Sequence, residues 1–255
     1  MTANTAPQQE TTSSYNRQAA RTQLGGNLRE LLAERFLLIG KFVKLGDRVL
    51  EVGAGTGLAY DYYPDVELVQ TDAEWNPWLD AVASADALPF PDASFDKITC
   101  FLVLHHLPYP KKALAEFSRV LKPGGMAVIL ESCNSTLLRF LLSLRVHEYV
   151  DAAVDPFGDE TCQRGEDNWD GNNAIGRLLF DDAKRFAREC PEFTIVHRRY
   201  SECLSFINSG GVNHKSPYIP LPGFAMRMLI RLDKLLCALA PGLFALSYEV
   251  VLRRN

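Results

Sequence analysis

The chain has 255 residues, of which 47% are hydrophobic and 23% are charged, a composition typical of a globular protein with a sizeable core. A formal net charge of −4 without a dominant basic stripe argues against a nucleic-acid-binding protein. No uninterrupted apolar run of 18 or more residues is present, so no transmembrane span is predicted. Six cysteines without a C-x-x-C pair indicate free thiols in a reducing cytoplasm: Cys100, Cys133, Cys162, Cys190, Cys203 and Cys237.

The first residues, 1–14, are rich in Thr, Gln, Ser and Ala and lack the apolar region of a secretory signal. We predict a disordered tail there, followed by a single domain over residues 15–255. Apolar residues recur at helical spacing over 27–42, which predicts a helix that packs on the sheet before the first strand.

A buried strand over residues 49–52 leads directly into a turn with glycines at 53, 55 and 57. Glycine tolerates positive φ and lets a ligand approach the backbone closely. The dinucleotide pattern G-x-G-x-x-G fails because Leu58 follows Gly57. Glu51 precedes the turn, and its carboxylate disfavours a pyrophosphate but favours an ammonium or sulfonium group. The segment therefore predicts a site for a cationic nucleoside.

The next strand, over residues 66–70, is followed by Thr71 and Asp72. An acid at the carboxyl end of the second strand can accept hydrogen bonds from both ribose hydroxyls. The alternative for Asp72 is a helix N-cap. Residues 73–79 leave no room for a full crossover helix before a short strand over 81–85. Trp75 in this segment either covers a base or is a buried structural residue.

Residues 49–57, VLEVGAGTG, resemble the first motif of the class I S-adenosylmethionine-dependent methyltransferases. Two further strings, at 84–96 and 116–125, follow in the order found in the branch often called type 11. The resemblance extends over about residues 48–131. It implies an α/β, doubly wound, mostly parallel seven-stranded sheet of the Rossmann-like methyltransferase type, with an insert after the fifth strand.

The resemblance also implies the cofactor, S-adenosyl-L-methionine, and the positions that bind it. Asp86 corresponds to the residue that accepts from the adenine amino group, a task suited to a carboxylate because it offers acceptors only. The short segment 73–79 departs from typical family members, which carry a longer helix there. The cofactor residues that the resemblance implies are Glu51, Gly53, Ala54, Gly55, Gly57, Asp72, Ala73, Asp86, Ala87 and Leu102.

Beyond residue 131 the resemblance is weak. After a strand over 95–104, a helix over 111–121 and a strand over 126–130, the pattern predicts a helix over 134–150 and then an acidic, amide-rich loop over 155–176. The calcium-loop spacing is absent, and we predict no metal site. The loop is either a solvated segment or a cover for the substrate, in which Trp169 stacks on a sugar ring.

The last elements predicted are a helix over 178–190, a strand over 193–200, a helix over 224–239 and a strand over 244–254. We expect segments 134–176 and 208–240 to cover the substrate side of the domain. One face of the helix over 224–239 is apolar and is flanked by Arg227, Arg231 and Lys234. We expect this helix to cover the pocket, and contact with a membrane surface is the alternative.

Methyl transfer from a sulfonium mainly requires placing the nucleophile in line with the methyl group. A hydroxyl acceptor also benefits from a base, and His105 and His147 are the candidates, with a structural role as the alternative for each. We therefore expect a cytoplasmic enzyme that methylates a small-molecule or glycan hydroxyl. The alternatives are a catalytically silent S-adenosylmethionine-binding regulator and a methyltransferase for a lipid-like acceptor.

Overall fold

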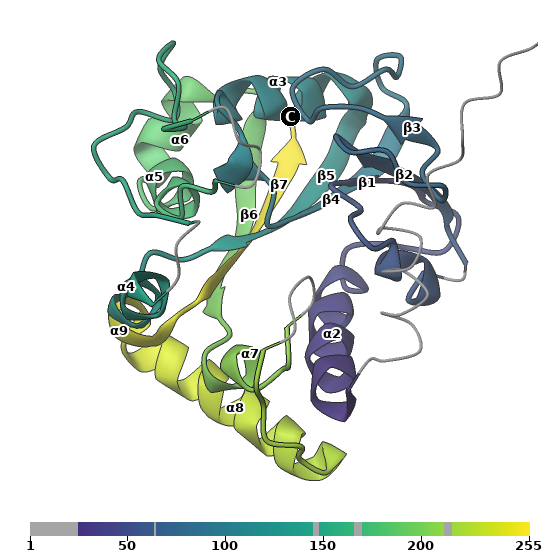
Figure 1. Cartoon of the computed structure of the whole chain (residues 1–255). Coiled ribbons are helices and arrows are strands. Elements are labelled where there is room, and N and C mark those ends of the chain that lie inside the picture. Colours follow the sequence, from purple (N-terminus) through teal and green to yellow (C-terminus); the bar gives the residue numbers. More distant parts are fainter. Residues whose placement is uncertain (1–24, 64, 145–147, 166–169, 212–215) are drawn as a thin grey trace, which may run out of the picture.

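The computed structural model describes residues 25–63, 65–144, 148–165, 170–211 and 216–255. Within these residues, seven strands form one sheet in the order β3-β2-β1-β4-β5-β7-β6 (Figure 1). Strands β1 to β5 pair in parallel, whereas β7 is antiparallel to both β5 and β6. This topology confirms the predicted doubly wound, mostly parallel seven-stranded sheet.

The strands are β1 (Arg48–Val52), β2 (Glu67–Asp72), β3 (Ala81–Val82), β4 (Phe95–Phe101), β5 (Leu121–Ser132), β6 (Phe193–Ser201) and β7 (Ser247–Arg254). The helices are α2 (Gly26–Ile39), α3 (Pro110–Val120), α4 (Thr136–Ser143), α5 (Ile175–Phe180), α6 (Ala183–Glu189), α7 (Leu204–Ile207), α8 (Gly223–Leu239) and α9 (Pro241–Phe244). Two 3₁₀ turns, η1 (Leu58–Asp61) and η2 (Leu104–His106), follow β1 and β4. The segment between β5 and β6 carries α4, α5 and α6, and the predicted insert over 134–176 contains α4 and the start of α5.

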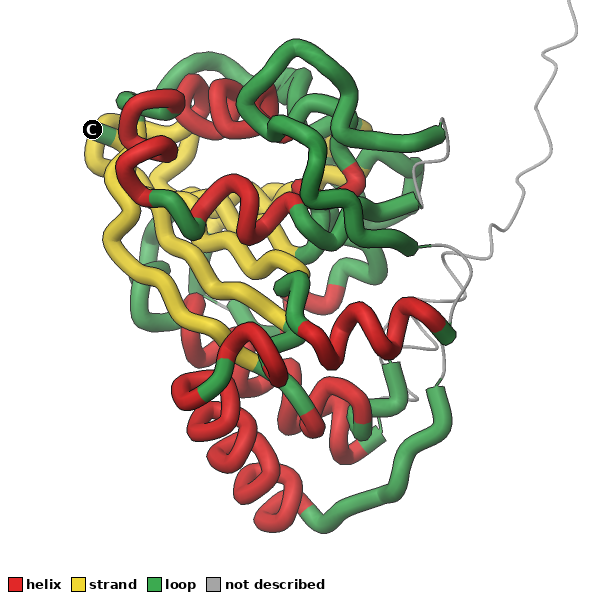
Figure 2. The backbone as a smooth tube through the Cα atoms, turned by 90° about the vertical axis from the view of Figure 1, so that its left-hand side faces the viewer, coloured by secondary structure: helices red, strands yellow, loops and turns green. Residues whose placement is uncertain are grey.

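Helices cover both faces of the sheet, because side chains alternate between the faces along each buried strand. On one face, Leu50 of β1 belongs to a core cluster that includes Phe117 of α3 and Phe186 of α6. On the other face, Val49 belongs to a cluster with residues of α2 and α8, among them Ile230. Figure 2 shows the sheet between these helices, with the long helix α8 below it.

Several element boundaries differ from the sequence expectations. Between β1 and β2 the structure has only the 3₁₀ turn η1, and the strand expected over 81–85 is reduced to β3. The helix expected over 134–150 ends at Ser143, while β5 begins at Leu121 instead of at 126. The segment 122–125 thus lies in the strand, and Gly124 accommodates a φ of +76° there. All six cysteines are buried and free, as predicted.

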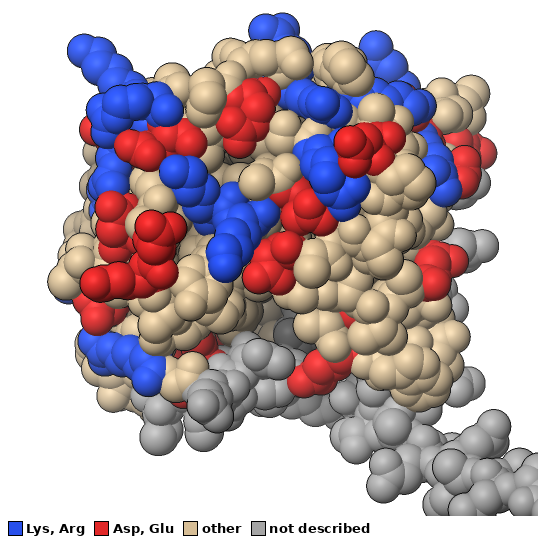
Figure 3. All heavy atoms as spheres, turned by 90° about the horizontal axis from the view of Figure 1, so that it is seen from above, with Lys and Arg blue, Asp and Glu red and all other residues tan. Residues whose placement is uncertain are grey.

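The apolar face of the helix over 224–239 that the sequence indicates does not pack on the protein. Phe224, Met228 and Leu239 of α8 are exposed, whereas Met226 and Ile230 on the opposite face are buried. No helix among the described residues is long and apolar enough to span a membrane. Seen from above, the molecule carries Lys and Arg interspersed with Asp and Glu (Figure 3).

Candidate active site

The glycine loop after β1 has the backbone conformation that its sequence predicts. Gly53, Gly55 and Gly57 have φ angles of +76°, +48° and +67°, respectively. The N–H groups of Gly53 and Ala54 both donate to the carbonyl of Thr71, at 2.9 Å each, which ties the loop to β2. A Cβ on Gly53 would lie 2.2 Å from Cγ2 of Val103, whereas a Cβ on Gly55 would meet no atom within 4 Å. Gly53 is therefore required by packing, and Gly55 borders open space that a ligand can use.

Asp72, at the end of β2, holds this loop in place. Its Oδ2 accepts from the N–H of Gly55 at 2.8 Å, and its Oδ1 accepts from the N–H of Glu74 at 3.0 Å. No helix begins at this point, so the alternative of a helix N-cap is wrong. An ionised carboxylate offers about four acceptor positions, which leaves Asp72 capacity for ribose hydroxyls. Ala73 follows it and is exposed.

Asp72→Ala is expected to weaken S-adenosylmethionine binding by about 1.5–3 kcal/mol, the scale of a hydrogen bond to a charged group. Calorimetric titration measures this change. The matched control is Asp47→Ala, because Asp47 also accepts a backbone N–H, that of Lys44 at 2.7 Å, but lies before β1 at the other end of the strand. Equal affinities of the Asp72 variant and the control would remove Asp72 from the binding site.

Glu51 of β1 lies beside the glycine loop in a partly aromatic environment. Gln70 Nε2 donates to Glu51 Oε2 at 2.6 Å. Burial, together with the negative charge of Glu51, raises the pKa of Tyr63. Phe36 of α2 stacks on Tyr62 with ring centroids 4.1 Å apart and meets Tyr63 edge-on at 5.5 Å. Helix α2 thus closes this side of the site with aromatic side chains.

Asp86 lies in a turn after β3. Ala85 packs into the same core cluster as Leu50, while Asp86 is half-buried and its Oδ1 accepts from Ser84 Oγ at 2.5 Å. The N–H of Ala87 donates to the carbonyl of Ser84 at 3.1 Å, which closes the turn. These contacts leave further acceptor positions of Asp86 for an amino group.

Leu102 marks the end of β4 at the same edge of the sheet. It has a φ of +56°, and its N–H donates to the carbonyl of Leu130 at 2.7 Å. Among the described residues, neither Asp72 nor Asp86 has an ion-pair partner. Carboxylates without neighbouring cations favour a positively charged ligand. The edge therefore fits the cationic nucleoside that the sequence predicts.

His105, in η2, is 3% exposed and is held by a buried carboxylate. Its Nδ1 lies 2.7 Å from Oε2 of Glu131, whose Oε1 accepts from the N–H groups of Val103 and Leu104 at 2.9 and 2.7 Å. Burial acts to lower the pKa of His105, but the charge and hydrogen bond of Glu131 raise it above its ordinary value. The pKa of Glu131 is correspondingly lowered, because the charge of His105 outweighs burial. The two side chains form a buried hydrogen-bonded pair, which becomes an ion pair when His105 is protonated.

The pKa of the neighbouring His106 is shifted in the opposite direction to that of His105. Its ring centroid lies 4.1 Å from that of His105, and its Nδ1 is buried without a hydrogen-bond partner among the described residues. Burial and the positive charge of His105 lower the pKa of His106 to about 4. His106 is therefore neutral near neutral pH.

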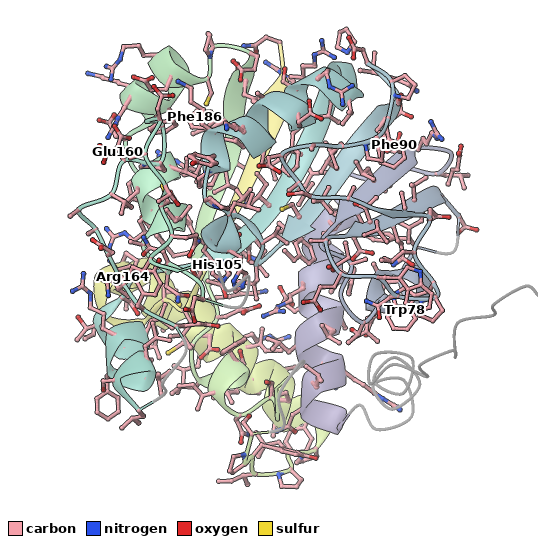
Figure 4. The ribbon with its side chains drawn as sticks, turned by 45° about the horizontal axis from the view of Figure 1, so that its top comes forward. Trp78, Phe90, His105, Glu160, Arg164 and Phe186 are labelled. Carbon is pink, nitrogen blue, oxygen red and sulfur yellow. The ribbon has the colours of Figure 1, made fainter. Side chains whose placement is uncertain are left out.

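The insert packs directly on His105. The His105 carbonyl accepts from the N–H of Asn172 at 2.8 Å and from Nε2 of Gln163 at 2.6 Å. A Cβ on Gly171 would lie 2.5 Å from Cδ2 of His105, so the backbone at Gly171 lies against the ring. Figure 4 shows His105 beside the insert loop that carries Arg164. The structure thus brings the insert and this candidate base together.

Other sequence-predicted residues have different outcomes. His147 and Trp169 lie outside the described residues. Trp75 is 58% exposed, so its interpretation as a buried structural residue is wrong. The described part of the chain contains no group of three or more His, Cys, Asp or Glu side chains arranged to hold a metal ion.

Ion pairs occupy part of the acidic loop. Asp151 pairs with Arg164 at 3.0 Å, and Asp155 pairs with Arg185 at 2.6 Å. Asp155 belongs to the loop over 155–176, whereas Asp151 precedes it and pairs with Arg164 of the loop. One loop carboxylate is therefore engaged within the protein, which weakens the argument that the loop offers free carboxylates to sugar hydroxyls.

Sequence reasoning missed Glu131 as a site residue. The sequence does contain a signal that could have identified Glu131: it is an acid near the end of a strand that is otherwise buried and apolar. A buried charge requires a partner, so such an acid indicates a paired group nearby. The identity of that partner depends on the pairing of β4 with β5, which the sequence pattern does not specify.

Comparison with known proteins places these features in a family. A family model described as a methyltransferase domain matches residues 50–129, the part of the chain that contains the glycine loop, Asp72, Asp86 and Leu102. A demethylmenaquinone methyltransferase from Renibacterium salmoninarum is 41% identical over 103 residues, which cover 36% of this chain and 44% of the relative. The chain spans about half the length of the first curated relatives that it matches.

A longer match is the ubiquinone/menaquinone biosynthesis C-methyltransferase UbiE of Cronobacter sakazakii, 34% identical over 200 residues, or 76% of this chain and 66% of the relative. The crystal structure of an S-adenosylmethionine-dependent methyltransferase from Archaeoglobus fulgidus shares the fold with a TM-score of 0.54, at 14% identity and with coverage of 94% and 99% of the two chains. The glycine loop, the strand-end acids and these similarities together show that the chain belongs to the class I S-adenosylmethionine-dependent methyltransferases.

Proposed function

We propose that this protein transfers a methyl group from S-adenosylmethionine to a ring carbon of a hydroxylated, lipid-like aromatic acceptor of the quinol type. The observation that carries this proposal is the similarity to the Cronobacter sakazakii C-methyltransferase. It extends over 200 residues and therefore beyond the matched domain at 50–129 into the acceptor-side segments. The glycan acceptor has no support among these relatives. A lipid-like acceptor, one of the alternatives from the sequence, takes its place.

When bound, S-adenosylmethionine supplies a methyl group already activated on a sulfonium. Transfer forms a carbon–carbon bond, breaks the sulfur–methyl bond and releases the ring proton. The tasks left to the protein are binding and orientation, which together can lower the barrier by about 7–11 kcal/mol. Glu51, Asp72 and Asp86 provide acceptors for the cofactor's ammonium, ribose and amino groups, respectively.

A quinol ring becomes a stronger carbon nucleophile when a hydroxyl proton is removed. In this proposal His105, in its neutral form with Nδ1 bound to Glu131, accepts that proton and becomes the cation that the Glu131 carboxylate stabilises. The raised pKa of His105 favours proton uptake, whereas His106, with a pKa of about 4, is a weak base. His147 stays a second candidate outside the described residues.

The direct test incubates the protein with S-adenosylmethionine and a chemically reduced naphthoquinol that has one open ring position. We expect S-adenosylhomocysteine to be released and the naphthoquinol to gain one methyl group, both followed by mass spectrometry. The control acceptor carries a methyl group at the open position and should give no product. Air oxidation distinguishes the methylated atom, since a C-methyl product reoxidises to a quinone and an O-methyl product does not.

Two outcomes would contradict the proposal. An O-methyl product would restore the hydroxyl acceptor predicted from the sequence. Binding of S-adenosylmethionine without release of S-adenosylhomocysteine in the presence of naphthoquinol or sugar acceptors would favour the silent regulator.

A further inference from the structure

Five large apolar side chains form a stripe on the outer surface of α8. They recur at intervals of three and four residues, which places them on one face of the helix. They are between 43% and 75% exposed: Phe224, Met228, Leu232, Leu235 and Leu239. We call this set the α8 stripe.

The fold does not require the α8 stripe for packing. Met226 and Ile230, on the opposite face of α8, are buried against Leu31 of α2, and Cys237 is buried against the other core cluster. The helix is therefore already anchored by its inner face. Contiguous apolar surface without a packing role is typical of interaction sites.

The apolar surface continues onto two neighbouring helices. Helix α9 follows α8 and exposes Leu243, and α4 exposes Phe140 and Leu144. Thr136 Oγ1 of α4 donates to the carbonyl of Gly242 in α9 at 3.3 Å, which fixes these helices side by side. Helices α4, α9 and α8 follow one another along one side of the molecule (Figure 1). Strand β5 leads into α4, so this side also borders the carboxyl edge of the sheet, where the candidate active site lies.

The charged side chains of α8 that flank the stripe are all cationic. They are Arg227, Arg231 and Lys234. Two of them form ion pairs with acids of α2, Arg227 with Glu30 and Lys234 with Glu34. These pairs keep the two cations beside the stripe.

The acid of α8 itself, Asp233, is buried. Its carboxylate accepts from the backbone N–H groups of residues 203–205 at 2.8–3.0 Å. The exposed surface of α8 therefore carries cations and no carboxylate of its own. Anionic phospholipid headgroups complement this pattern, whereas an antiparallel pairing of two copies of α8 would bring cations near cations.

We propose that the α8 stripe, together with the exposed apolar residues of α4 and α9, docks the protein peripherally on an anionic phospholipid surface. Helix α8 lies in the interface plane, with its apolar side chains at the boundary between headgroups and acyl chains and its Arg and Lys side chains among the phosphates. This inference goes beyond the proposed reaction and does not depend on it. Such docking would place the active-site edge where a lipid-soluble acceptor resides.

Co-sedimentation of the full chain with lipid vesicles tests the proposal. We expect binding to phosphatidylcholine vesicles that contain phosphatidylglycerol, weaker binding to phosphatidylcholine alone, and partial release by salt. The double variant Met228→Gln/Leu235→Gln should lower the partition coefficient by at least about tenfold, because both exposed side chains lose their apolar surface. Arg231→Glu should lower it selectively on the anionic vesicles.

Matched controls exist elsewhere on the surface. Leu45→Gln replaces an exposed leucine in the loop after α2, and Arg188→Glu replaces an exposed arginine on α6. Neither should change vesicle binding, and all variants should melt at the wild-type temperature because each site is exposed.

Unchanged vesicle binding of the double variant would overturn the proposal. A wild-type protein that does not bind vesicles would also overturn it. If that protein also self-associates in a concentration-dependent way and the double variant does not, a second copy of the chain occupies the stripe. Methylation of a water-soluble naphthoquinol should be the same in wild type and double variant. Absence of that activity in a wild-type protein that binds vesicles would count against the proposed function alone.

Discussion

Gly53→Ala is expected to destabilise the protein and abolish S-adenosylmethionine binding, whereas Gly46→Ala should leave binding unchanged. Both glycines have left-handed backbones, with φ of +76° and +82°, so alanine costs about 1–2 kcal/mol at either position. Only at Gly53 would the new Cβ also collide, at 2.2 Å from Val103 Cγ2, while Gly46 has no atom within 4 Å. Overpacking of this kind adds about 1–3 kcal/mol and displaces the loop.

Urea unfolding and calorimetric titration measure the two effects separately. A second substitution should relieve the collision. Val103→Ala removes Cγ2 and leaves Cβ of residue 103 at 3.5 Å from the new methyl group, which is an ordinary contact. Gly53→Ala is expected to have a lower free energy of unfolding than Gly46→Ala. The double variant Gly53→Ala/Val103→Ala should recover most of this difference. Equal destabilisation by Gly53→Ala and Gly46→Ala would show that packing against Val103 imposes no constraint.

The placement of the glycine loop and of Asp72 at one edge of the sheet could be predicted from the sequence because local patterns determine it. A buried strand followed by alternating glycines identifies the turn at Gly53, and parallel strands place their carboxyl ends at one edge. Asp72, as the last residue of β2, therefore reaches the glycine loop, where it binds the N–H of Gly55. Each of these placements needs only the strand boundaries and their order.

The acceptor side depends on contacts between residues distant in sequence. His105 and Glu131 are 26 positions apart, and they meet only because β4 and β5 pair with Phe101 opposite Leu130. The insert contacts at Asn172 and Gln163 depend in turn on where the chain returns to η2. Residue spacing along the chain contains no information about this register.

Helix α8 shows another limit of periodicity. Its buried Met226 and Ile230 and its exposed Met228 and Leu232 are all apolar, so the helix is hydrophobic on two faces. When both faces are apolar, a 3.6-residue period identifies the helix but not the side that packs on the sheet. For this reason the sequence did not indicate that the stripe lies on the exposed side of the helix.

Glu131→Ala is expected to lower the free energy of unfolding by about 3–5 kcal/mol, because it leaves the buried His105 without its counter-ion and two backbone N–H groups without an acceptor. The matched control is Glu67→Ala. Glu67 pairs with Arg48 at the same 2.7 Å distance, but both side chains are exposed, and such pairs contribute about 0–1 kcal/mol. Urea unfolding of the two variants measures the contrast.

The pH dependence provides the sharper measurement, because the sign of the His105 contribution should reverse. In the wild type the pKa of His105 is raised above 6.5, so its stabilising contribution is complete below pH 6.5 and is lost as pH rises through the folded value. The lowered pKa of Glu131 makes its contribution complete above pH 4.5 and lost at lower pH, so the ion pair stabilises most between these values. Without the Glu131 carboxylate, burial, the largest influence on the pKa of His105, is opposed only by the charge of Glu148. We therefore expect the pKa to fall below its ordinary value and the variant to lose stability as pH falls below 6.5.

His106, whose pKa is lowered to about 4, contributes an acid-side loss of stability to both proteins. This loss does not cancel, because Glu131 itself acts on the pKa of His106, so the two stability curves are compared above about pH 4.5. The difference between the curves should be largest between about pH 4.5 and 6.5 and should narrow toward alkaline pH, where His105 is neutral in both proteins. A difference that stays constant from acid to alkaline pH would show that His105 and Glu131 share a neutral hydrogen bond in place of an ion pair. In that case the destabilisation of Glu131→Ala would report the lost hydrogen bond to His105 and the unsatisfied N–H groups of Val103 and Leu104.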